Sequence, residues 1–310
     1  MGHWLAVIVV GAAALVGCGG NDCCTIDAAI DAPADVLVDA VLTNPGFSRP
    51  TSQLSAWTSP SQGTFQAAPL DLSCLGASRS DSPTTVTVTL GVHVTDFQSG
   101  NIVPSAMVGA FDGTTITSPF VSTTTDSGGN ATLTIPTGRQ RIGFSIASTS
   151  ARNTYVLDRI LAPSTASQSM ALQSMSNATF ATLPALVGLT PISGSSIELG
   201  TARDCQGHSL SSFIATVSSA RGIPAHLGQA KTFYFSDAVG LPTRNQPSGA
   251  RDGQFMVMDL TATSQAYVQI WGFRDLADLT AGTLTLIEEL AVPVPGDSTL
   301  LTDQDPRATQ

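Results

Sequence analysis

Residues 84–97 read TTVTVTLGVHVTDF, and this stretch decides the fold class. Apolar residues alternate along it with polar or small ones, so the pattern repeats every two residues. Successive side chains of an extended chain point to opposite faces, and the stretch therefore predicts a strand with one buried face. The expected buried face carries Val86, Val88, Leu90, Val92 and Val94, and the opposite face carries Thr87, Thr89, Gly91, His93 and Thr95.

Further short strands follow at regular intervals. They are expected in PSAMVGAF (104–111), on both sides of the turn in TTTDSGGNATLTIPTG (123–138), in RIGFSIAS (141–148) and in TYVLDRIL (154–161). About six short strands in roughly eighty residues, separated by turns rich in Gly, Asp and Asn, are typical of an antiparallel β-sandwich. The fold class predicted is therefore all-β.

The order of these strands and turns resembles the carboxypeptidase regulatory-like domain, a transthyretin-like or Ig-like sandwich. The residues that match its pattern are Gly91, Asp96, Gly100, Val103, Pro104, Ala106, Val108, Thr125, Asp126, Gly128, Leu133, Pro136 and Gly138, with Ile135 as an additional apolar position. In metallocarboxypeptidases this domain stands beside a separate zinc-containing catalytic domain. The resemblance therefore implies a fold for residues 73–165 and brings no activity with it.

A second, more divergent copy is expected over residues 191–296. The residues that echo the first copy are Gly200, Asp204, Gly207, Leu210, Asp252, Gly253, Phe255, Val257 and Leu260, while Thr261 and Ser264 stand near the expected Pro and Gly of the strand end. A different β-domain that reuses Asp-Gly turns is the alternative. Between the copies, residues 166–190 form the expected helical connector, with Phe180, Leu183, Leu186 and Val187 at helical spacing.

The N-terminus predicts export and lipidation. Residues 4–17 are an almost wholly apolar run of fourteen residues, too short for the roughly 20 residues that cross a bilayer as a helix. The residues that end the run, Leu15, Val16, Gly17 and Cys18, resemble the lipobox of bacterial lipoproteins. The resemblance implies a signal peptide over residues 1–17 and acyl chains on Cys18, although no Lys or Arg precedes the apolar run. An ordinary signal peptide or a buried strand is the alternative.

The remaining terminal segments are predicted to be unstructured. Residues 18–72 combine acidic and Pro-Ser-rich sequence, which predicts an extended, disordered tether between the lipid and the folded part. Residues 297–310 are expected to form a polar tail. Gly19 follows the cysteine in place of the aspartate that resembles an inner-membrane retention signal. The outer membrane or the cell surface of a bacterium is the predicted location.

Charge and cysteine content bound the partners. The net charge is −10 and Lys231 is the single lysine, so nucleic-acid binding is excluded because no basic cluster can neutralise phosphates. Besides Cys18, the chain has Cys23, Cys24, Cys74 and Cys205, which allow three pairings. A disulfide between Cys74 and Cys205 is favoured because both precede or begin a sandwich. The pairing state of Cys23 and Cys24 stays open, and zinc binding by these cysteines is disfavoured because no ligand-spaced partner accompanies them.

No catalytic, metal-binding or cofactor motif occurs in the sequence. His93, His208 and His226 are isolated, and the calcium site conceivable at Asp126 and Asn130 lacks acidic density. We therefore predict no enzyme, no metal and no cofactor, and expect a lipid-anchored envelope protein with non-catalytic binding or structural domains. Its partners are expected to be the membrane and an unidentified envelope protein or polysaccharide. An envelope hydrolase with a loop-built carboxylate site is the alternative.

Overall fold

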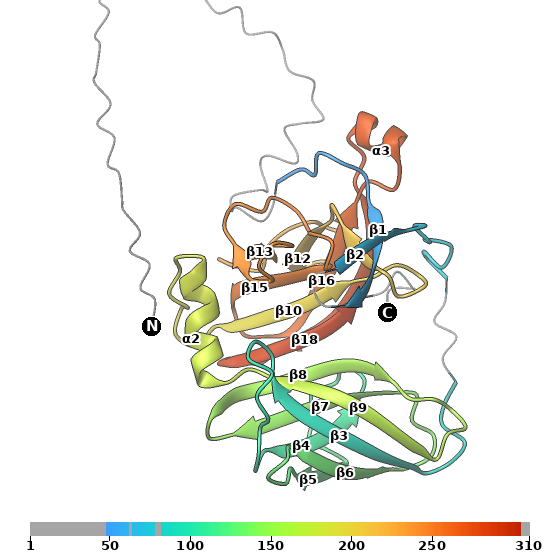
Figure 1. Cartoon of the computed structure of the whole chain (residues 1–310), viewed down its shortest axis with the longest axis vertical. Coiled ribbons are helices and arrows are strands. Elements are labelled where there is room, and N and C mark those ends of the chain that lie inside the picture. Colours follow the sequence, from blue (N-terminus) through green and yellow to red (C-terminus); the bar gives the residue numbers. More distant parts are fainter. Residues whose placement is uncertain (1–47, 62–63, 78–81, 305–310) are drawn as a thin grey trace, which may run out of the picture. The chain divides into compact units, whose positions relative to one another are not determined.

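The protein is described by a computed structural model over residues 48–61, 64–77 and 82–304 (Figure 1). It is an all-β protein built from sandwiched sheets, as the sequence predicts. The strands are β1 (Ser55–Ser61), β2 (Thr64–Ala68), β3 (Val88–Asp96), β4 (Met107–Asp112), β5 (Val121–Thr124), β6 (Asn130–Ile135), β7 (Arg141–Ser148), β8 (Ala151–Ile160), β9 (Ser167–Ser174), β10 (Ser196–Ala202), β11 (Ser209–Ser211), β12 (Ile214–Ser218), β13 (Lys231–Phe235), β14 (Pro242–Thr243), β15 (Gln254–Leu260), β16 (Thr263–Gly272), β17 (Thr285–Val294) and β18 (Ser298–Gln304). The helices are α2 (Asn177–Leu186) and α3 (Leu276–Ala281).

The alternating stretch at residues 84–97 forms β3, and its predicted face is buried. Val88, Leu90, Val92 and Val94 are at most 2% exposed and belong to one hydrophobic core. Val86 is half-buried and precedes the strand. The alternation therefore predicts the orientation of β3 correctly, because only one face of this strand meets the opposing sheet.

The strand pairings show that the chain contains two copies of one fold. In the first copy, β3 pairs with β6 antiparallel and with β9 parallel. In the second copy, β10 pairs with β15 antiparallel and with β18 parallel. The opposing sheets also correspond. In the first copy β7 pairs with β4 and β8, and in the second copy β16 pairs with β12 and β17. Each copy is thus a two-layer sandwich, mainly antiparallel, with one parallel edge pair.

The registers of the two copies agree, and they correct the sequence match in detail. Gly91 lies opposite Thr132, and Leu199 lies opposite Met256. One residue further along each ladder, Val92 corresponds to Gly200, so Gly200 is not the counterpart of Gly91. The sequence match at Gly200 is therefore shifted by one residue from the register in the structure.

The hairpin echo is also shifted. The N–H of Gly129 donates to the carbonyl of Asp126 at 3.0 Å, and the N–H of Gly253 donates to that of Ala250 at 3.1 Å. Ala250 therefore occupies the position of Asp126, which the sequence match gives to Asp252. Both glycines have a positive φ and approach a backbone carbonyl of the neighbouring strand, so the glycine is the shared requirement of the two hairpins.

The two copies share one continuous sheet. β8 of the first copy pairs with β18 of the second in parallel, and this joint produces a nine-stranded sheet in the order β14-β13-β15-β10-β18-β8-β7-β4-β5. Figure 1 shows β10, β18 and β8 side by side. The β6-β3-β9 sheet and the β12-β16-β17 sheet pack against it to form two cores, and both cores draw side chains from both copies. The sandwiches are therefore fused rather than independent.

The segment between the copies contains more than a helix. Residues 167–174 form β9, which completes the first sandwich, and the predicted helix follows as α2. The hydroxyl of Ser176 accepts the N–H of Thr179 at 3.1 Å and caps the helix. Phe180, Leu183 and the C-cap residue Val187 are buried in the first core. Leu186, the fourth residue of the predicted stripe, is 44% exposed.

Two segments predicted to be unstructured contain strands. Residues 55–68, within the expected tether, form β1 and β2, and β1 pairs with β11 of the second copy. Residues 298–304, within the expected polar tail, form β18 at the centre of the nine-stranded sheet. Burial explains both differences, because Leu54 and Leu300 are at most 2% exposed. Residues 18–47 and 305–310 lie outside the described residues.

Candidate functional site

A groove runs beside β9, where the β6-β3-β9 sheet ends and the nine-stranded sheet continues. It consists of two adjoining depressions of about 290 and 310 Å³, both lined by Arg159, Arg203 and Asp303. β9 contributes Ala171 and Gln173 to one wall. We call this the inter-repeat groove, because the strands that form it come from both copies.

The inter-repeat groove has a mainly polar lining with a small apolar part. Val156 of β8, Leu199 of β10 and Leu301 of β18 line it and belong to the first core. Gly200 adds a position without a side chain. The three apolar side chains are at most 8% exposed, so they offer little apolar surface to a ligand.

The charges in the groove are paired. Arg203 Nε lies 2.6 Å from Asp303 Oδ1, and Arg159 Nη1 lies 3.4 Å from Asp303 Oδ2, so two guanidinium groups share one carboxylate. Arg141 Nη1 lies 2.8 Å from Asp158 Oδ2, with both side chains almost fully buried. These carboxylates are therefore engaged by arginines.

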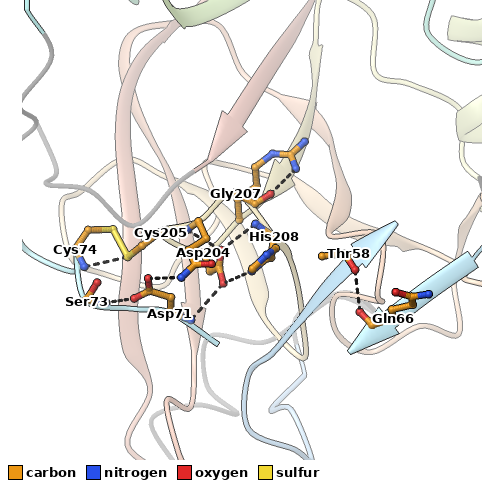
Figure 2. Close-up of polar contacts among 11 residues, drawn as sticks. Thr58, Gln66, Asp71, Ser73, Cys74, Asp204, Cys205, Gly207 and His208 are labelled. Atoms are coloured by element: carbon orange, nitrogen blue, oxygen red, sulfur yellow. Dashed lines mark hydrogen bonds and ion pairs between the residues drawn. A yellow bond between two sulfur atoms is a disulfide. The ribbon is translucent and has the colours of Figure 1, made fainter. Parts of the chain in front are cut away.

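One end of the groove is closed by the turn that follows β10, and Figure 2 shows this turn. Cys205 is bonded to Cys74, with the two Cα atoms 5.8 Å apart, so the predicted disulfide is confirmed. The N–H of Cys205 donates to the carbonyl of Asp71 at 2.9 Å, and the N–H of Asp71 donates to Asp204 at 3.2 Å. The disulfide and these hydrogen bonds attach the segment before the first sandwich to the second copy.

Asp96 and Asp204, matched by the resemblance, have a structural role. Asp96 is 3% exposed and accepts hydrogen bonds from the backbone N–H groups of Ser99 and Ser176 and from the hydroxyl of Thr179. Burial opposes ionisation of Asp96, but these hydrogen bonds outweigh it and lower its pKa to about 2. Asp204, fully buried, likewise accepts from two backbone N–H groups of its own turn. Each carboxylate holds together the turn after the first strand of its copy.

The three histidines beyond the expected signal peptide lie apart and bond to local partners. His93 Nδ1 lies 2.9 Å from Asn130 Oδ1, and His208 Nδ1 lies 3.1 Å from Asp204 Oδ2. His226 Nδ1 lies 3.2 Å from the hydroxyl of Thr216, and burial lowers the pKa of His226 to about 4. The structure brings none of these histidines into the inter-repeat groove.

The turn considered for calcium is a closed hydrogen-bonded turn. Asp126 Oδ1 accepts the backbone N–H groups of Gly128 and Asn130, each at 2.8 Å. Within residues 48–61, 64–77 and 82–304, no three His, Cys, Asp or Glu side chains gather at metal-binding distance. Over the same residues, neither helix is long and apolar enough to cross a membrane.

The lipobox residues Leu15, Val16, Gly17 and Cys18 lie outside the described residues, so lipidation stays a prediction. The groove arginines carry no signal in the sequence. Arg141, Arg159 and Arg203 follow no motif. The pairing of β7 with β8 brings Arg141 and Arg159 together, and the joint between β8 and β18 adds Arg203 of the second copy.

Comparisons with known proteins do not identify a family. No family model matches the chain, and no curated protein does. Among solved structures, the chain is similar to the Bacillus anthracis TIE protein, with 11% identity and a TM-score of 0.25 over 73% of this chain, and it spans only 35% of that protein. It is also similar to the shaft pilin SpaA from Lactobacillus rhamnosus GG, with 9% identity and a TM-score of 0.21 over 73% of this chain and 100% of the pilin. At these TM-scores neither likeness indicates a function for the chain.

Proposed function

We propose that the chain is a lipid-anchored cell-envelope protein whose fused β-sandwiches, of the carboxypeptidase regulatory-like kind, form a non-catalytic binding or structural module. The disulfide between Cys74 and Cys205 carries this proposal, because such bonds persist in oxidising compartments outside the cytosol. It joins residues 131 positions apart, and export would bring the chain to a compartment where this bond forms. The lipobox at Leu15–Cys18 supplies the anchor in this proposal.

The hydrogen bonds and ion pairs of the acidic side chains support a module without catalytic activity. Of the three carboxylates that line the inter-repeat groove, Asp158 and Asp303 are each bound by arginine, and Asp204 accepts backbone N–H groups of its own turn. Asp96 and Asp204 hold turns. General acid-base or nucleophilic catalysis needs a proton-transferring group beside a nucleophile or an unengaged carboxylate, so binding through the groove fits the structure better than hydrolysis.

Labelling with radioactive palmitate tests the anchor. The full chain is expressed in a bacterial host beside Cys18→Ala, with Cys24→Ala as the matched control in the same segment. The parent and Cys24→Ala are expected to incorporate label and to sediment with outer membranes, whereas Cys18→Ala is expected to lose both properties. Equal labelling of all three forms would show that Cys18 is not the lipidated residue.

The non-catalytic role is tested by replacing His93, His208 and His226 together with Gln. The variant is expected to fold and to retain any envelope partner as the parent does. A hydrolytic or metal-dependent activity that is present in the parent and absent in this variant would contradict the proposal.

A further inference from the structure

The nine-stranded sheet carries a row of polar side chains along the inter-repeat groove. Gln254 of β15 lies opposite Thr201 of β10, and Thr201 lies opposite Asp303 of β18. Residues directly opposite each other on neighbouring strands present their side chains on the same face of the sheet. All three residues line the same depression of the groove, so the row crosses three strands on the face that a ligand would meet.

The wall formed by β3 and β9 adds a second polar pair. Thr95 of β3 lies opposite Gln173 of β9, and both line the same depression as the row. Among the described residues, no hydrogen bond engages the side chains of Thr95, Gln173, Thr201 or Gln254, and each is half-buried or exposed. Hydroxyl and amide groups can both donate and accept, so these four side chains can bind the hydroxyl groups of a ligand.

Two arginines in the groove have N–H groups to spare. Arg159 Nη1 and Arg203 Nε bond to Asp303, and Arg203 Nη1 donates to the carbonyl of Gly207 at 3.0 Å. Within residues 48–61, 64–77 and 82–304, Arg159 Nε and Nη2 and Arg203 Nη2 form no hydrogen bond. Both side chains are 35% exposed. These donors can therefore reach a carboxylate that enters the groove.

The exposed charges of the groove favour an anionic ligand. Two guanidinium groups, on Arg159 and Arg203, stand beside the single exposed carboxylate of Asp303, which leaves one positive charge in excess. The other charged side chains of the lining have at most 8% of their surface exposed, and they are Arg141, Asp158 and Asp204. In a chain with a net charge of −10, the groove thus presents a local positive charge.

Phe97 gives the groove an aromatic contact. This residue directly follows β3, is half-buried and lines the same depression as the polar row. The ring of Phe235 packs edge-on against it at a centroid distance of 6.1 Å, and the backbone N–H of Phe97 donates to the carbonyl of Ser174 at 2.8 Å. The face of an aromatic ring attracts C–H groups, such as those on the apolar face of a pyranose ring.

These features fit a sugar chain better than a peptide. A peptide that binds beside a sheet edge needs pockets for alternate side chains, and the apolar residues of this groove are almost fully buried. A ligand rich in hydroxyl groups can instead bond to the threonines and glutamines. A neutral sugar would leave the spare arginine donors without an acceptor, so the chemistry of the groove favours a sugar that carries carboxylates.

We infer that the inter-repeat groove binds an acidic glycan, whose carboxylate bonds to Arg159 and Arg203 and whose hydroxyl groups bond to Thr95, Gln173, Thr201 and Gln254. The inference rests on the proposed function and deepens it, because it names the ligand class and the site of a non-catalytic binding module.

Calorimetric titration tests the inference on the full chain purified in detergent. The probes are a hexamer of galacturonic acid, the same hexamer with every carboxylate methyl-esterified, and hexaglutamate. The variants are Arg159→Gln and Gln254→Leu. Arg152→Gln is the matched control, since Arg152 lies on the same strand as Arg159, is 37% exposed and pairs with Asp297 at 3.6 Å, away from the groove. Exposed ion pairs contribute little to stability, so all variants should keep the unfolding midpoint of the parent.

The parent is expected to bind the acid hexamer about ten-fold more tightly than the ester, because hydrogen bonds between charged groups are stronger than neutral ones. Arg159→Gln is expected to lose most of this preference. Gln254→Leu is expected to weaken both hexamers to a similar degree, because it removes a bond to a hydroxyl group. Arg152→Gln should match the parent.

Several results would overturn the inference. They are equal affinity of the parent for acid and ester, equal loss of affinity in Arg159→Gln and Arg152→Gln, and no binding of either hexamer. Tighter binding of hexaglutamate would assign the groove to acidic peptides and overturn the stated ligand class. None of these results bears on the anchor, which palmitate labelling tests. Release of reducing ends from the acid hexamer would instead contradict the non-catalytic role, so the two failures can be distinguished.

Discussion

Glu198 is a buried carboxyl group whose replacement should stabilise the protein. It is fully buried on β10, and Oε1 accepts the hydroxyl of Thr302 at 2.6 Å, whereas Oε2 has no hydrogen-bond partner among the described residues. Its ladder position, opposite Val257, corresponds to that of Leu90, opposite Leu133, in the first copy. The second copy thus has a glutamate where the first has a core leucine.

The size of the effect follows from the pKa. Burial raises the pKa of Glu198 from 4.5 to about 8, only partly offset by the hydrogen bond from Thr302. Above pH 4.5 the unfolded chain releases this proton while the folded chain keeps it, so the free energy of unfolding decreases until pH 8 and then levels off. At 1.36 kcal/mol for each pKa unit, the total loss is roughly 5 kcal/mol, a large part of the 5–15 kcal/mol of a typical domain.

Glu198→Leu is therefore expected to raise the free energy of unfolding by a few kcal/mol at pH 8 and by much less at pH 5. The loss of the Thr302 hydrogen bond offsets about 1 kcal/mol of the gain. Glu198→Gln keeps a partner for Thr302 and removes only the ionisation. Urea unfolding at pH 5, 6.5 and 8, with the disulfide intact, measures all three proteins.

Glu289→Leu is the matched control, because this second buried glutamate is fully bonded. Its oxygens accept from Arg221 at 2.9 Å, from the N–H of Gly222 at 2.7 Å and from Gln269 at 2.9 Å. This replacement is expected to destabilise the protein by about 3 kcal/mol or more, because it leaves those donors unpaired. If Glu198→Leu kept the pH dependence of the parent between pH 5 and 8, the assigned ionisation would be wrong.

Three further perturbations test the fold. Val88→Asp places an unpaired charge in the first core at a cost of several kcal/mol. Because one sheet joins the copies, the fluorescence of Trp271 in the second copy should report unfolding as well. An unchanged Trp271 signal beside an unfolded first copy would contradict the fusion of the two sandwiches. Asp96→Asn weakens charge-assisted hydrogen bonds to its turn and should cost about 1–3 kcal/mol at pH 7. Since the pKa of Asp96 is lowered to about 2, its contribution is present above pH 3.8 and is lost as the pH falls toward 2, so the variant should lose less stability than the parent over that range in acid-unfolding curves. Cys205→Ser should cost about 2–5 kcal/mol, and reduction of the parent should lower its unfolding midpoint to that of the variant; a midpoint unaffected by reduction would show that the bond contributes nothing.

The pattern of apolar and polar residues in a short stretch of sequence predicts those elements whose burial and bonding involve mainly neighbouring residues. β3 could be predicted because one face meets a core and the other meets solvent, which leaves the alternation visible in the sequence. The turn carboxylate Asp96 could be found through the resemblance, and its bond to Ser99 is local. Its bonds to Ser176 and Thr179, some eighty residues further along the chain, have no local signal. The disulfide could be predicted because both cysteines precede or begin a sandwich and few alternatives remained.

The joint between the copies could not be predicted in this way. β18 is short and lies between two strands, one of them from the first copy, so both of its faces are largely buried and the alternation disappears. Its polar start and end, near Ser298 and Asp303, read as a tail. The inter-repeat groove depends on this long-range pairing because its lining comes from both copies, and Glu198 is buried on the same sheet. The candidate site therefore follows from the tertiary arrangement rather than from any motif.

The bond between Cys74 and Cys205 also sets how far the protein can be stretched when it is pulled from its N-terminal side. Such a pull first reaches β1 and β2, which pair only with each other and with β11. If they detach, the chain between residues 48 and 74 lengthens to roughly 90 Å. Extension then stops at a covalent link to the second copy, and the whole first sandwich lies within the closed loop, shielded from the tension. Residues 48–74 can thus extend under load, whereas the disulfide limits further extension on this side. The inter-repeat groove lies on the C-terminal side of that bond.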